Sequence, residues 1–209
     1  MARVTGMKEK LHMPLYDAIF VPGAVNGTEA STLKGRFPDA RGLRFFIDVQ
    51  NKTRLETNLQ AAGVLPSLNS FEARAMRVVV SSLNELAKRK TAPLTQVDEA
   101  RFLAELIYGS VTSLLVGEKT MIEMPTYWFP AGAGVSPGGW GNATHFVQSH
   151  GEPNHLNSFR FAEPVFIESQ QNFRVEMNFP QDVPDSVADA IGPYRIWVVL
   201  DGYLTRDVQ

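Results

Sequence analysis

The chain has 209 residues and a formal net charge of −2, from 20 Lys+Arg against 22 Asp+Glu. This balance argues against a protein that coats nucleic acid through a basic face, and the absence of cysteine excludes disulfides and thiolate chemistry. A chain of this length suits one all-β domain or two small ones. Residues 1–10 are polar and predict no signal peptide, and every apolar run is far shorter than the about 20 residues that span a bilayer.

The first part of the chain combines an arm with two strands. Residues 1–41 contain short apolar pieces interrupted by proline and glycine, which predicts an extended arm that packs over another part of the molecule. Residues 43–49 are rich in aromatic and β-branched side chains and predict a half-buried strand. Residues 71–80 alternate between apolar and charged side chains before three valines and predict a second strand, with residues 54–66 connecting the two.

One helix and a return to strands are expected in the middle of the chain. Thr95 is a suitable N-cap, acidic residues follow in the first turn, and apolar residues recur at helical spacing up to about Tyr108. Residues 111–116 and 120–124 are expected to be paired strands. A long Pro/Gly-rich loop follows at 125–158, and loops of this length are usually functional or form interfaces.

The C-terminal part is expected to consist of long alternating strands at residues 159–167, 173–179 and 194–204. At residues 173–179 the alternation predicts one buried and one polar face, whereas residues 194–204 carry apolar side chains on both faces. Because two packed sheets hide such faces, we expect a mainly β fold: a single jelly-roll β-sandwich of about eight strands with one inserted helix and long loops. Residues 1–41 would form the arm and residues 42–209 this single domain.

The three histidines His145, His150 and His155, with an acidic residue between them, are the one cluster of metal-ligand types in the sequence. Imidazole and carboxylate groups bind zinc or non-haem iron. Two ligands on one face of a strand lie an even number of residues apart, whereas these histidines are five apart in a segment with glycine and proline. We therefore expect solvated loop histidines and no metal.

A glycine-rich loop can bind phosphate, but here we expect a plain loop or a subunit contact. The glycine-rich stretch at residues 131–141 has no Gly-Lys pair opening a helix, which a P-loop requires. The chain offers no cysteine nucleophile. We expect no catalytic residue, no cofactor and no enzymatic activity.

Aromatic side chains are the candidates for a contact surface. Trp128, Phe129 and Trp140 lie in or beside the long loop, where a monomer would expose them, and grouped exposed aromatics often mark an interface. The alternative is that the loop folds back and buries them. On the last strand, Trp197 and Tyr203 lie opposite the side chains expected in the core. These five residues are the subunit-interface candidates.

Several phrases of the sequence resemble one family, and they are spread over residues 57–209. They are TNLQAAGVLP at 57–66, FEARAMRVVV at 71–80, VGEK at 116–119, FPAGAGV at 129–135, FRVEMNFP at 173–180 and RIWVVLDGYLTRDVQ at 195–209. In this order they resemble the jelly-roll major capsid proteins of tailless icosahedral bacteriophages, which often contain a membrane. The chain is similar to the vertical single jelly-roll group, or to shorter relatives of the double jelly-roll lineage.

The resemblance implies a structural capsid (coat) protein, made in the host cytoplasm and located in the virion. Its partners would be copies of itself in trimers or pseudo-hexameric capsomers, with other capsid proteins and an internal lipid membrane as further partners and no specific nucleic acid. The family carries no catalytic residues. The chain is long enough for one jelly roll and not two, so a minor role such as a penton or spike base stays open.

Two other interpretations stay open. One is a carbohydrate- or receptor-binding β-sandwich module of a virion, in which Tyr127, Trp128 and Trp140 would stack on a sugar. The other is a cupin-like metalloenzyme that uses the three clustered histidines, and the odd spacing of these residues makes it the less favoured of the two.

Overall fold

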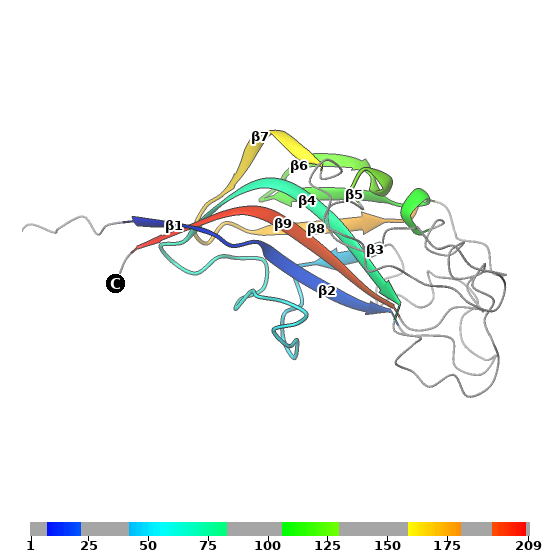
Figure 1. Ribbon diagram of the computed structural model, residues 1–209, viewed down its shortest axis with the longest axis horizontal. Coiled ribbons are helices and arrows are strands. Elements are labelled where there is room, and N and C mark those ends of the chain that lie inside the picture. The colour runs from blue at the N-terminus through cyan, green and yellow to red at the C-terminus, as the bar shows by residue number, and fades with distance from the viewer. Residues whose placement is uncertain (1–7, 22–41, 83–105, 130–158, 181–193, 208–209) are drawn as a thin grey trace, which may run out of the picture.

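The computed structural model describes residues 8–21, 42–82, 106–129, 159–180 and 194–207 (Figure 1). In these ranges the protein is mainly β, with nine strands in two antiparallel sheets and one short 3-10 helix. No helix among these residues is long and apolar enough to cross a membrane.

The larger sheet has five strands. Its central pair is β9 (Tyr194–Asp207) and β4 (Ser70–Ser82), which run antiparallel along most of their length. Beyond β4 lies β7 (Arg160–Ile167), and on the other side β9 pairs with both β1 (Lys8–His12) and β2 (Leu15–Val21). Figure 1 shows β4 and β9 as long curved strands that cross the molecule together.

The smaller sheet has four strands. Their order is β3 (Gly42–Phe45), β8 (Phe173–Asn178), β5 (Val111–Val116) and β6 (Lys119–Pro125). The short 3-10 helix η1 (Thr126–Trp128) follows directly after β6.

β1 and β2 form one line along β9, interrupted at Pro14. The pairs His12–Tyr203 and Leu15–Leu200 belong to the same register, so β2 continues the pairing that β1 begins. Proline has no N–H to donate and is tolerated at a sheet edge. Residues 8–21 were expected to be part of an extended arm, and they are instead strands of the larger sheet. The difference arises because β9 pairs with their backbone and the core buries Leu15.

The strand pairs are nested along the chain. β5 and β6 form a hairpin, β4 pairs with β7 outside it, β3 pairs with β8, and β2 pairs with β9. Two further pairings, β4 with β9 and β5 with β8, join these pairs into the two sheets. Strands from the two halves of the chain thus pair antiparallel, from the hairpin of β5 and β6 outward to β2 and β9.

One apolar core lies between the two sheets. It draws Phe71, Met76 and Val198 from the larger sheet and Leu114 and Val175 from the smaller one. The strands bury alternate side chains: in β8 the residues at 173, 175 and 177 are buried, while those between them are half-buried. The sandwich therefore rests on the period-two alternation that the sequence predicts.

The larger sheet bends where irregularities in neighbouring strands align. β4 has a bulge between Ala73 and Ala75, opposite Gly202 of β9, and β7 shifts its register against β4 at the same place. A Cβ atom at Gly202 would lie only 2.0 Å from the carbonyl oxygen of Glu72. Glycine here allows the backbones to approach closely, and the bulge increases the local twist.

Most predicted strands are confirmed, with shifted ends. The predicted strand at 43–49 ends at Phe45, because Phe46 adopts a left-handed backbone with φ of 70° and turns the chain. Of the predicted helix, only residues 106–108 lie in the described ranges, and they are helical. The strands expected at 71–80, 111–116, 120–124, 159–167, 173–179 and 194–204 correspond to β4, β5, β6, β7, β8 and β9.

Candidate subunit-contact surfaces

Three exposed aromatic rings form a row, two of them on η1 and one on the helical turn before β5. Tyr108, Tyr127 and Trp128 are 72%, 46% and 48% exposed. The ring centroids of Tyr108 and Tyr127 are 5.7 Å apart, and those of Tyr127 and Trp128 are 6.1 Å apart. The ring of Trp128 also meets the edge of Phe159 at 6.2 Å. We call Tyr108, Tyr127 and Trp128 the aromatic row.

A buried hydroxyl network holds the aromatic row in place. The hydroxyl of Ser110 donates to the carbonyl oxygen of Leu106 at 2.6 Å, and it lies 2.7 Å from the hydroxyl of Thr126, from which it can accept. The hydroxyls of Thr112 and Thr126 are 2.7 Å apart, and the backbone N–H of Thr126 donates to the carbonyl oxygen of Ser110 at 2.9 Å. Satisfied buried networks of this kind restrict a segment to one geometry. The helical turn before β5 and the 3-10 helix after β6 are therefore fixed side by side.

Phe129, an interface candidate, is a core residue. Its side chain is 0% exposed and its ring meets Phe159 edge-on at 5.4 Å. Its carbonyl oxygen accepts a hydrogen bond from the N–H of Val78 at 3.1 Å, which ties the end of η1 to β4. Trp128 therefore lies at the surface, whereas its neighbour Phe129 lies in the core.

Trp197 lies on the outer face of the larger sheet and is half-buried. Its indole N–H donates to the carbonyl oxygen of Leu55 at 3.1 Å, and the guanidinium of Arg195 lies 5.6 Å from its ring centroid. Arg195 also approaches Glu56 at 3.4 Å. Part of this outer face is therefore covered by the connection between β3 and β4, while Leu55 itself stays exposed.

Tyr203 lies between two cations. The ammonium of Lys10 is 4.7 Å and the guanidinium of Arg74 is 4.8 Å from its ring centroid, and His12 packs against it at 5.4 Å. Hydrogen bonds from Lys10 and Arg74 lower the pKa of Glu72, which bridges the two cations. Tyr203 is thus the centre of a charged cluster that joins β1, β9 and β4.

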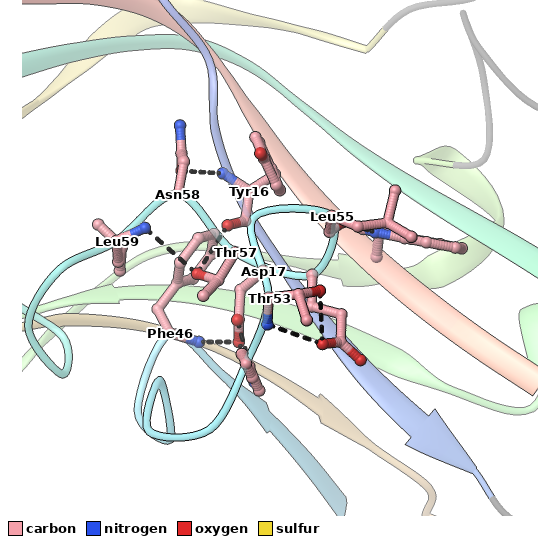
Figure 2. Close-up of polar contacts among 11 residues, drawn as sticks. Tyr16, Asp17, Phe46, Thr53, Leu55, Thr57, Asn58 and Leu59 are labelled. Atoms are coloured by element: carbon pink, nitrogen blue, oxygen red, sulfur yellow. Dashed lines mark hydrogen bonds and ion pairs between the residues drawn. The ribbon is translucent and has the colours of Figure 1, made fainter.

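The connection between β3 and β4 lies along the side of β2 that faces away from β9 (Figure 2). The side-chain amide of Asn58 donates to the carbonyl oxygen of Pro14 at 2.7 Å and accepts from the N–H of Tyr16 at 3.0 Å. The hydroxyl of Thr57 and the backbone N–H of Asn58 both donate to the carbonyl oxygen of Tyr16, at 3.1 and 3.4 Å. The hydroxyl of Tyr16 in turn donates to the carbonyl oxygen of Arg54.

Asp17 fixes the same connection from the inner side of β2. Its carboxylate is 0% exposed and accepts a hydrogen bond from the N–H of Phe46 at 2.7 Å (Figure 2). Both of its oxygens also accept from the ammonium of Lys52, each at 2.9 Å. Burial raises the pKa of Asp17 above its ordinary value, while the hydrogen bonds from Phe46 and Lys52 act in the opposite direction. A charge inside the apolar strand Leu15–Val21 is the sequence signal that could have revealed this buried pair.

The remaining candidates lie outside the described residues. These are Trp140 and the three histidines His145, His150 and His155. The chain was expected to lack a Gly-x-Ser-x-Gly nucleophile elbow, and this expectation is wrong, because residues 134–138 match that pattern. They lie outside the described residues too. Among the described residues no group of three or more His, Cys, Asp or Glu side chains is placed to hold a metal ion.

Comparison of the chain with protein-family models, with curated proteins and with solved structures found no match.

Proposed function

We propose that this chain is a structural coat subunit built on a single jelly roll, which assembles with copies of itself into the capsomers of a virion shell. The nested order of its strand pairs supports the jelly roll. When β1 and β2 are taken as one interrupted strand, eight strands make two sheets of four, and the halves of the chain pair from the hairpin of β5 and β6 outward to β2 and β9.

The aromatic row is the observation that carries the self-assembly. An exposed group of Tyr and Trp is typical of contact surfaces, because such rings combine apolar area with a polar group. Here Tyr108, Tyr127 and Trp128 are held outward by a network whose members are buried. Since a protein fold alone does not define a function, this rigid exposed row is the stronger support. The resemblance in the sequence agrees with it, and the near-zero net charge permits close packing of many copies.

Sedimentation and negative-stain electron microscopy of the purified chain test this proposal. We expect trimers, pentamers or larger shells. The double variant Tyr127→Ala/Trp128→Ala should reduce the assembled fraction severalfold, whereas Phe166→Ala, which removes another exposed aromatic ring from β7, should not. A strictly monomeric wild-type protein at every salt concentration and pH would refute the coat function.

Carbohydrate or receptor binding is the second candidate, and the aromatic row also favours it. Rings that expose a face can stack on the apolar face of a sugar, and Tyr108 is 72% exposed. A glycan array and a fluorescence titration separate the two functions. Saturable binding lost in Tyr127→Ala/Trp128→Ala, together with no assembly of the wild type, would favour the binding module.

A further inference from the structure

The edge strand β2 has a side that a neighbouring strand could occupy. β9 pairs with one side of β2, and unpaired N–H and C=O groups on the other side of an edge strand attract further chains. β1, which continues the same line, has lysines at positions 8 and 10, and edge lysines discourage such pairing. β2 has no lysine, so its protection must come from elsewhere.

Asn58 imitates the missing neighbour. In an antiparallel sheet, the adjacent strand donates to one carbonyl oxygen and accepts from a nearby N–H. The side-chain amide of Asn58 does both, since it donates to the oxygen of Pro14 and accepts from the N–H of Tyr16. The backbone N–H of Asn58 then donates to the oxygen of Tyr16. A single residue thus satisfies the outward backbone groups of residues 14 and 16.

The segment that carries Asn58 is fastened at several points. Asp17 binds Lys52 and Phe46, which precede the segment, and the indole of Trp197 binds the carbonyl oxygen of Leu55 within it. Glu56 accepts hydrogen bonds from the backbone and the hydroxyl of Thr53, both at 2.9 Å. The connection between β3 and β4 also contains three non-glycine residues with left-handed backbone, Phe46, Asn51 and Leu68. Such conformations cost free energy and persist where the surroundings hold them.

We infer that residues 53–59 form an intramolecular edge cap, which excludes a strand of a second copy of this chain from β2. The cap occupies the hydrogen-bonding positions of that strand. A released cap would leave residues 14–16 open to antiparallel pairing, and in a solution of the purified chain the strand available to pair with them is the same uncapped edge of a second copy. The inference concerns the edge of the sheet and does not rest on the proposed coat function.

The double variant Thr57→Val/Asn58→Ala tests the cap, because it removes the two side chains of the cap that hydrogen-bond to the backbone of residues 14 and 16. The control is Thr120→Val, at an exposed position of β6 in the other sheet. Amide hydrogen exchange is measured at Tyr16, and sedimentation velocity over a concentration series, both under conditions where the wild type sediments as its smallest species. We expect exchange at Tyr16 to become at least about tenfold faster at low concentration. At high concentration the double variant, unlike Thr120→Val, should associate and regain protection at Tyr16.

Two outcomes would overturn the inference. One is fast exchange at Tyr16 with no association at any concentration, and the other is association that leaves Tyr16 unprotected. If the double variant does not fold, Asn58→Asp serves instead, because it places an acceptor against the carbonyl oxygen of Pro14 and should release the cap by repulsion. Since the wild-type assembly state is measured separately, failure of the coat function and failure of the cap are distinguishable.

Discussion

Arg77 of β4 and Asp201 of β9 form a two-point ion pair across the larger sheet. Nε of Arg77 lies 2.6 Å from one carboxylate oxygen and Nη2 lies 2.8 Å from the other. Both side chains are mostly shielded from solvent, at 17% and 27% exposed. The pair lies next to the bend at Gly202, where the register between the two strands changes. It therefore holds the two longest strands together close to the point where their pairing is irregular.

Breaking this pair should destabilise the protein measurably. Asp201→Asn is expected to lower the free energy of unfolding by about 1.5–3 kcal/mol, since charge-assisted hydrogen bonds in a shielded position are lost. Arg77→Lys should cost less than Arg77→Ala, because lysine keeps the charge and loses the two-point geometry. Urea unfolding of the single and double variants measures the coupling. Strictly additive effects of Arg77→Ala and Asp201→Asn would contradict the expected interaction.

Gly202→Ala should distort the larger sheet. The added Cβ would lie 2.0 Å from the oxygen of Glu72, so the backbones of β9 and β4 must separate, at a cost of at least about 2 kcal/mol. The matched control is Gly117→Ala, at a turn with φ of 60° and open space around the new methyl group. It should cost about 1–2 kcal/mol from the backbone alone. Thermal unfolding compares the two, and a Gly202→Ala effect no larger than the control would refute this account.

The free energy of unfolding should depend on pH through the titration of Asp17. Because burial raises its pKa, the folded state binds a proton more tightly than the unfolded state, whose carboxyl titrates near 3.8. The contribution of Asp17 is therefore fully present below that value and is lost as the pH rises through the raised pKa. Unfolding free energies of wild type and Asp17→Asn between about pH 3.5 and 7 should show the wild type losing stability relative to the variant as pH increases. The opposite slope would mean that the ion pair with Lys52 outweighs the burial.

Thr126→Val should loosen the support of the aromatic row. The variant keeps the shape of the side chain but leaves the hydroxyls of Ser110 and Thr112 without their shared partner, at a cost of about 1–3 kcal/mol. The near-ultraviolet circular dichroism of the aromatic rings should weaken as their fixed packing relaxes. Thr120→Val, at an exposed position of β6, is the control and should change neither signal. An unchanged spectrum in Thr126→Val would show that the network does not position the row.

The strands themselves were predictable because their signal is local. In β8 the alternation of Phe173, Val175 and Met177 with polar residues follows from the geometry of one extended strand, and it predicts which side chains enter the core. The prediction for residues 8–21 was wrong because it also used only local signals. Pro14 and the glycines that follow resemble a loop, whereas the pairing with β9 that makes these residues strands involves residues far along the chain.

The contact candidates were predictable only in part. Trp128 is exposed as expected, but its neighbour Phe129 is buried, because η1 turns the two side chains in different directions. The exposed Tyr108 was not expected to join them. Its ring contacts that of Tyr127 because the hydroxyl network holds the two ends of the hairpin of β5 and β6 together.

The sequence by itself determined a cysteine-free, mainly β chain and the position and inward face of most of its strands, because strand formation and side-chain alternation depend on residues close together in the chain. Only the tertiary structure decided the nested order of the pairs, the bend at Gly202 and the edge cap. These features join residues such as Asp17 with Lys52 and Arg77 with Asp201, and the pattern of a single segment carries no information about which distant segment will meet it.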